Sequence, residues 1–227
     1  MDEMTLAAQR LTSLAEPFLA DSDMDGLANR LHEDWTPDCL MLLLEHADTN
    51  VLRCAVICLG LIAPVSASGA LATLLHYPDE TIVEAAEDAL WSISFQAGGP
   101  LPQAVLSRIS KAIDSGETEN VTPMLTQLIK SHPTYAEAYH QRCQAYYLQH
   151  AYEPALRDAR RAFALNPYHF SALAIQGHCH VALGRLSEGL EIYRRVLALH
   201  PRMQGIRELV QQLRRKLAPQ VDGMVGV

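Results

Sequence analysis

Cys54 and Cys58 are one of two groups of side chains whose type and spacing suit metal binding. They lie four residues apart, which places both thiols on one face of a helix, where they could ligate a metal ion. The same face carries Val51, Ala55 and Leu59. Because free cysteine is a common core residue, we interpret this pair as part of an apolar core.

His178, Cys179 and His180 form the second group and are consecutive in the sequence. Neighbouring residues on a helix point in different directions, so these three side chains cannot converge on one ion. No second pair of ligands at helical spacing supports them. We therefore predict no metal site, and we expect His178 to face a groove.

The sequence contains no nucleophile elbow, phosphate-binding glycine loop, dinucleotide fingerprint or zinc-protease helix. The carboxylates at positions 84, 87 and 88 fit an exposed helix side near Trp91. Arg160-Arg161 and Arg194-Arg195 form a repeated basic pair, for which a solvated outer face is favoured over a binding patch, since surface charges usually contribute little. These observations predict a protein that is not an enzyme and takes no cofactor.

The elements that carry these side chains are predicted to be helices, repeated in the first half with a period of 31 residues. The repeated positions include three leucines and one aspartate per unit, namely Leu40, Leu43, Leu44 and Asp48, then Leu71, Leu74, Leu75 and Asp79. Each aspartate stands where an N-cap is needed. These residues resemble HEAT repeats over roughly 37–96, and the short unit is similar to the compact HEAT-like repeats of bilin-lyase-type proteins.

The second half repeats with a period of 34 residues. Pro133, Pro167 and Pro201 recur at this interval, each preceded by an apolar helix face that the proline ends. The pattern resembles the tetratricopeptide repeat (TPR) over about 102–203, with two good units at 136–169 and 170–203 and one degenerate unit before them. Among the departures, Arg142 replaces a leucine of that pattern, and His180 replaces a tyrosine that the repeat buries.

The predicted fold class is all-α, a right-handed α-solenoid of HEAT-like followed by TPR-like repeats. The predicted segments are N-terminal capping helices (1–36), HEAT-like repeats (37–97), a joint with the degenerate TPR (98–135), two TPR repeats (136–203), a C-terminal capping helix (204–217) and a flexible tail (218–227). Because the joint at 97–102 is short, we expect the two halves to form one continuous superhelix.

Charge is divided unevenly between the halves. Residues 1–100 carry 16 acidic and three basic residues, whereas residues 101–227 carry 10 acidic and 15 basic residues without a concentrated basic patch. This distribution disfavours a nucleic-acid partner. The charge-free stretch from Cys54 to Pro78 is interrupted by Pro64 and Gly69, which favours two buried helices over a membrane span. Five cysteines in a chain of this length indicate reduced thiols and a cytoplasmic location.

The resemblance to TPR proteins implies a groove lined by the first helices of successive repeats. The matching positions are Glu137, His140, Gln141, Gln144, Tyr147 and Leu148 from one helix and Ser171, Ala174, Ile175, His178, Val181 and Ala182 from the next. None of the twelve is Lys, Arg or Asn, the residue types with which relatives hold acidic peptide ends. We therefore expect a neutral, partly apolar peptide or protein partner.

The leading hypothesis is a non-catalytic protein-interaction scaffold whose partner is a peptide or another protein. Two alternatives remain open at this point. The short HEAT-like units also suggest a bilin-lyase-like protein or an accessory that handles a chromophore. The opposite charges of the two halves also suggest a structural homo-oligomer in which the acidic half of one chain meets the basic half of another.

Overall fold

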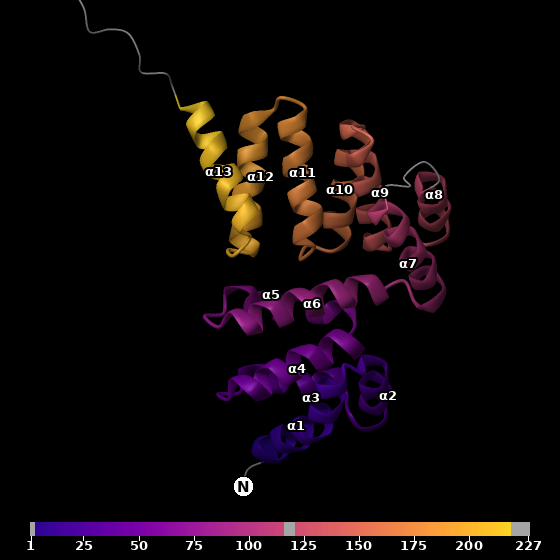
Figure 1. Ribbon diagram of the computed structural model, residues 1–227, viewed down its shortest axis with the longest axis vertical. Coiled ribbons are helices and arrows are strands. Elements are labelled where there is room, and N and C mark those ends of the chain that lie inside the picture. Colours follow the sequence, from indigo (N-terminus) through magenta and orange to yellow (C-terminus); the bar gives the residue numbers. More distant parts are fainter. Residues whose placement is uncertain (1–2, 116–120, 219–227) are drawn as a thin grey trace, which may run out of the picture.

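The computed structural model describes residues 3–115 and 121–218 of the chain, and these are built from helices and turns (Figure 1). The prediction of an all-α solenoid of helix pairs is confirmed. Part of the predicted tail, residues 219–227, lies outside the described residues. No helix in the described ranges is long and apolar enough to cross a membrane.

The N-terminal stack consists of α1 to α6, with short 3-10 turns between some of them. Its helices are α1 (Glu3–Asp21), α2 (Met24–Asp34), α3 (Pro37–Leu42), α4 (Thr49–Ile62), α5 (Ser68–Thr73) and α6 (Glu80–Gln96). Asp48 and Asp79 cap α4 and α6 through hydrogen bonds from the amides of Asn50 and Thr81, as predicted. Cys54 and Cys58 are buried in its apolar core, also as predicted.

The C-terminal array consists of α7 to α13. Its helices are α7 (Pro100–Asp114), α8 (Val121–Ser131), α9 (Ala136–Leu148), α10 (Tyr152–Leu165), α11 (Phe170–Ala182), α12 (Leu186–Leu199) and α13 (Gln204–Leu217). The helices α8, α10 and α12 each end two residues before a proline of the 34-residue repeat. This fits the exclusion of the helical conformation immediately before proline.

Two departures from the repeat pattern, Arg142 and His180, differ in how the packing accommodates them. Arg142 donates from Nε and Nη2 to the two carboxylate oxygens of Asp158, at 2.6 and 2.9 Å, and from Nη1 to Thr126 at 3.0 Å. This two-point ion pair joins α9 to α10 and brings α8 to the same guanidinium. His180 is buried, as predicted, and Arg160 approaches it.

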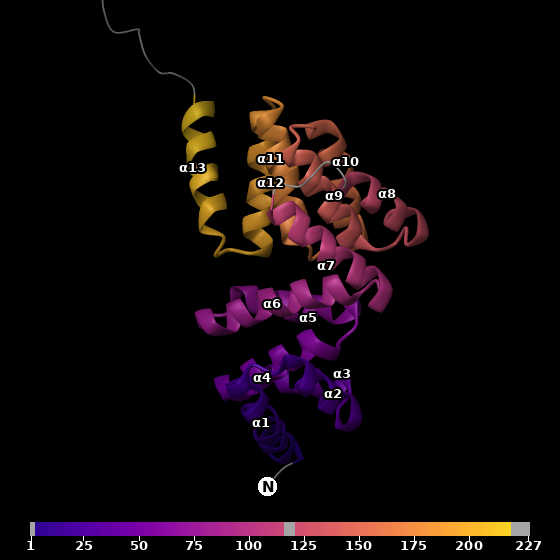
Figure 2. The same cartoon turned by 45° about the vertical axis from the view of Figure 1, so that its right-hand side comes forward.

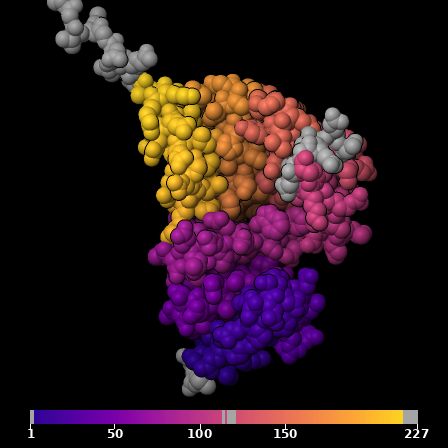
Figure 3. All heavy atoms as spheres, viewed as in Figure 1, coloured from indigo at the N-terminus to yellow at the C-terminus, as the bar shows by residue number. Residues whose placement is uncertain are grey.

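The two halves meet along α6, which lies across the turns that connect one repeat of the array to the next (Figures 1 and 2). Asn166 donates to Ser94 at 3.0 Å, His200 pairs with Glu87 at 2.6 Å, and the Tyr135 hydroxyl donates to the Phe95 carbonyl. The halves share one continuous surface in the space-filling view (Figure 3). The expectation of a single continuous superhelix is therefore wrong, because the N-terminal stack packs against an edge of the array.

Candidate functional site

The predicted groove positions of α9 and α11 differ in their accessibility. Glu137, His140, Gln141 and Ala174 are buried, so the expectation that they line an open groove does not hold for these four. The positions that are at least partly exposed are Gln144, Tyr147, Leu148, Ser171, Ile175, His178, Val181 and Ala182. The accessible part of this face therefore lies mainly toward the C-terminal ends of α9 and α11.

A buried hydrogen-bond network surrounds Glu137 at the other end of the face. Its carboxylate accepts from Gln141 at 2.8 Å and lies 3.1 Å from His140 Nδ1 and 3.0 Å from His169 Nε2. His169 caps α11, because its Nδ1 accepts the amide hydrogen of Ala172. Glu137 thus fixes α9 to the beginning of the next repeat.

The electrostatics of this network favour an ionised carboxylate. Burial by itself raises the pKa of Glu137, but the charge and hydrogen bond of His140 and the hydrogen bond of His169 outweigh it, so that pKa lies well below its ordinary value. Burial lowers the pKa of His169. Neutral His169 then carries its ring proton on Nε2 and donates a hydrogen bond from it to the Glu137 carboxylate.

Glu137, His140 and His169 also offer three ligand atoms within 4.8 Å of one another, which is close enough for a metal ion. A metal bound at His169 Nε2 would require the ring proton on Nδ1. That nitrogen already accepts the hydrogen bond from Ala172. The observed hydrogen bonds therefore fit a structural carboxylate network better than a ligand set.

The accessible end of the face is an aromatic cluster. The Tyr147 ring lies 6.0 Å from the His178 ring and 5.6 Å from the Tyr152 ring. His178 Nδ1 and the Tyr193 hydroxyl are 2.6 Å apart, which holds the imidazole in place from α12. Burial lowers the pKa of His178 and raises that of Tyr147. This cluster offers flat apolar surfaces with polar edges, a combination that is common at binding hot spots.

Tyr152, His169 and Tyr193 were absent from the sequence-based set. The signal for Tyr193 was available, because it occupies an aromatic position of the repeat and Gly177 leaves room for its ring. A Cβ added at Gly177 would lie 2.4 Å from a ring carbon of Tyr193. Nothing in the local sequence indicated that His169 would reach Glu137 across 32 residues.

Comparison with known proteins relates the chain to TPR proteins. No protein-family model matches the chain. Small glutamine-rich tetratricopeptide repeat-containing protein 2 of Saccharomyces cerevisiae is 32% identical over 88 residues, which is 39% of this chain and 25% of that protein. The chain therefore spans about a quarter of the length of this curated relative.

Two solved structures resemble about half of the chain. The first TPR of Spaghetti (RPAP3) bound to the HSP90 peptide SRMEEVD has a TM-score of 0.50 and 23% identity, covering 52% of this chain and 93% of that one. The Sgt2 TPR domain from Aspergillus fumigatus has a TM-score of 0.50 and 17% identity, and the match covers 57% of this chain and 91% of that one. These likenesses support a TPR fold in this chain.

Proposed function

We propose that the protein is a non-catalytic scaffold that binds a peptide or protein partner on the accessible end of the α9–α11 face. The observation that carries this proposal is the aromatic cluster of Tyr147, Tyr152 and His178, which remains partly exposed between two consecutive repeats. The proposal includes a HEAT-like N-terminal stack that supports the array. It also includes a cytoplasmic location, consistent with five free cysteines, four of them buried.

The chemistry of this face favours a neutral, partly apolar ligand. The peptide in the RPAP3 structure, SRMEEVD, ends in acidic residues and a carboxylate. No Lys or Arg occurs among the twelve predicted positions, and Glu137 adds a negative charge at the covered end of the face. An acidic peptide would therefore lack the charge-assisted hydrogen bonds that it needs.

The end near Glu137 is also covered physically. Leu90, Trp91 and Ser94 of α6 enclose, together with Glu137 and His169, a pocket of only about 50 Å³. That space accommodates little more than one or two water molecules. A ligand on this face would therefore bind near Tyr147 and His178 and leave the α6 end empty.

The test uses peptides selected from a random displayed library on the intact protein, followed by titration of the selected peptide. We expect Tyr147→Ala with His178→Ala to weaken binding at least about 10-fold, because truncating central aromatic contacts commonly costs more than about 1 kcal/mol. Tyr147→Ala alone is a control, because it keeps the contact between His178 and the Tyr193 hydroxyl that the double variant removes. Arg160→Ala with Arg194→Ala is the matched outer-face control and should leave affinity unchanged.

The same titration contains the contrary results. Unchanged affinity in the Tyr147 and His178 variant, with a normal unfolding temperature, would place the contact elsewhere. A steep loss of binding with added salt would contradict a neutral ligand, because salt screens charge pairs at exposed surfaces. A protein that forms stable dimers at the same concentrations would favour self-association instead.

A further inference from the structure

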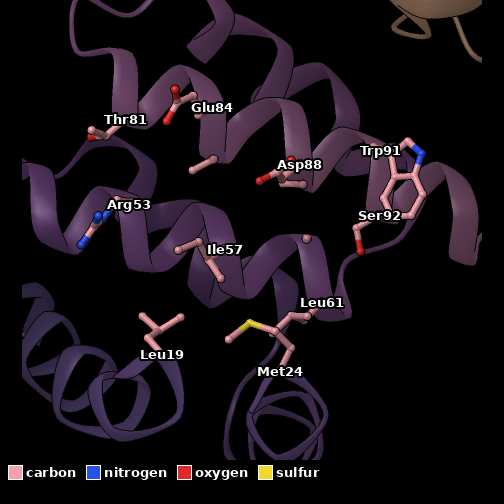
Figure 4. Close-up of a pocket in the computed structure, with 13 residues that line it drawn as sticks. Leu19, Met24, Arg53, Ile57, Leu61, Thr81, Glu84, Asp88, Trp91 and Ser92 are labelled. Carbon is pink, nitrogen blue, oxygen red and sulfur yellow. The ribbon is translucent and has the colours of Figure 1, made fainter. Parts of the chain in front are cut away.

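A second hollow lies in the N-terminal stack, away from the α9–α11 face. It is a groove of about 520 Å³ between α4 and α6, closed on its third side by the turn between α1 and α2 (Figure 4). The close approach of the two helices forms its floor, where a Cβ added at Gly60 would lie 2.8 Å from the Ala89 backbone. We call this hollow the α4–α6 groove.

The walls of the α4–α6 groove carry apolar side chains that remain partly accessible. Ile57 and Leu61 come from α4, and Leu19 and Met24 come from α1 and α2 (Figure 4). Trp91 stands at one end with 55% of its surface exposed, although its ring stacks on Phe95 at 5.0 Å. A row of accessible apolar groups ending in a tryptophan is the surface type on which amphipathic segments dock.

The α6 wall adds two exposed carboxylates to the groove. Glu84 and Asp88 are exposed, stand one helical turn apart and have no ion-pair partner among the described residues. Glu87, which is turned toward the array on the same helix, differs, since it pairs with His200. Arg53 supplies the single basic side chain of the groove lining (Figure 4).

We propose that the α4–α6 groove is a second docking site, which takes a positively charged amphipathic helix from another protein. The apolar side of that helix covers Ile57, Leu61 and Trp91. Its Lys or Arg residues, spaced one turn apart, pair with Glu84 and Asp88. The acidic excess of residues 1–100 favours the approach of such a helix.

The basic helix α13 of a second copy is a poorer match for this groove. Its apolar residues Ile206, Val210 and Leu213 are buried against the array, and its exposed side is mostly Arg, Lys, Gln and Glu. An apolar groove needs an apolar stripe on its ligand. The proposed partner is therefore a different protein, and it adds to the partner proposed for the α9–α11 face.

The experiment uses a labelled synthetic helix of 14 residues, the length of α4, with leucines at helical spacing and lysines beside them. A second peptide has glutamate at each lysine position. Binding to the full chain is followed by fluorescence anisotropy and by tryptophan emission, to which Trp35 and Trp91 contribute. We expect the lysine peptide to bind at least about 10-fold more tightly than the glutamate peptide, since like charges oppose docking.

Charge reversal then locates the contact. Glu84→Lys with Asp88→Lys should weaken binding of the lysine peptide at least about 10-fold, because two attractive charge pairs become repulsive. The matched control, Glu188→Lys with Glu191→Lys on α12, changes the net charge equally and should change affinity less than about 2-fold. Trp91→Ala should weaken binding about 10-fold without altering the charge preference.

Three results would overturn the proposal. One is equal binding of the two peptides, and another is equal loss in the α6 and α12 variants. The third is competition by a peptide selected on the α9–α11 face, which would place both ligands on that face. The Tyr147→Ala with His178→Ala variant separates the two sites, because it should leave the lysine peptide's affinity unchanged even if the function proposed for the array fails.

Discussion

The N-terminal stack and the C-terminal array hold their helices together in different ways. The buried polar residues of the N-terminal stack are Ser68 and Ser94, and the rest of its interior is apolar. The array buries Glu137, Asp158 and four histidines among its helices and turns. The array therefore depends on specific hydrogen-bonded pairs, whereas the stack depends on apolar contact that tolerates small shifts.

Helix capping also differs between the two regions. Here the N-terminal stack, and not the array, has more helix starts with side-chain hydrogen bonds. Side chains cap α2, α3, α4 and α6 in the stack. In the array, α9, α10, α12 and α13 have no side-chain cap, and only α11 among the fully described N-termini is capped, by His169. The stack thus fixes these four helix starts by local hydrogen bonds, although α5 begins without a side-chain cap, while most helices of the array begin without one.

The largest effect is expected from the carboxylate at the centre of the array. Glu137→Ala should lower the free energy of unfolding by about 3–5 kcal/mol, because it leaves the donors of His140, Gln141 and His169 unpaired in the interior. Denaturant unfolding measures the change. Glu137→Gln keeps an acceptor and should lose less, and Glu191→Ala on the surface should lose less than about 0.5 kcal/mol. A small loss in Glu137→Ala would show that apolar packing dominates in the array as well.

A glycine in each region tests its packing directly. Gly60→Ala places a Cβ 2.8 Å from the Ala89 backbone, and Gly177→Ala places one 2.4 Å from the Tyr193 ring. Each should cost about 1–3 kcal/mol by overpacking. Gly205→Ala is the control, since nothing lies within 4 Å of its added Cβ. If Gly177→Ala leaves the free energy of unfolding unchanged, the Tyr193 ring moves easily. The His178 ring, which contacts Tyr193, should then show shifted resonances in an NMR spectrum of the aromatic side chains.

The cap of α4 is expected to matter less. Asp48→Ala should cost about 1 kcal/mol, because the Asn50 amide loses its acceptor at the start of the helix. Asp48→Ser retains an acceptor and should restore most of the loss. Thermal unfolding of the three proteins provides the measurement, and an unchanged transition in Asp48→Ala would mean that tertiary contacts alone define the start of α4.

Acidification should produce the smallest effect of the series, and it should act through the array. Burial lowers the pKa of His169 and His178 in the folded protein. Below the ordinary histidine pKa of about 6.5, the unfolded chain then binds more protons than the folded one, so stability is complete above that pH and falls as the pH falls. Urea unfolding at pH 7 and pH 5.5 should show the decrease.

A variant links this decrease to the array. His178→Gln removes one titrating group but keeps a hydrogen-bonding partner for Tyr193, and it should reduce the pH dependence. An unfolding free energy that rises between pH 7 and pH 5.5 would contradict neutral buried histidines. The lowered pKa of Glu137 adds to the loss only at more acidic pH, below the ordinary range of a glutamate.

The sequence by itself determined the helices and their pairing within each repeat. The prolines of the 34-residue repeat predicted where α8, α10 and α12 end, and Asp48 and Asp79 predicted the starts of α4 and α6. The burial of Cys54 and Cys58 followed from their helical face. These features are local, because helix caps, breaks and apolar periodicity involve residues within one or two turns of one another.

Only the tertiary structure decided which surfaces remain open. Arg202 donates to the Tyr77 carbonyl across 125 positions, and His200 reaches Glu87 on α6. Such contacts join residues much further apart in the sequence than one repeat, so no spacing in the sequence predicted them. Because α6 packs across the turns of the array, it helps to bury Glu137 and leaves Glu84 and Asp88 exposed. The physical reason is that a repeat specifies contacts with its neighbours, whereas the packing of one stack on another depends on how their completed surfaces fit.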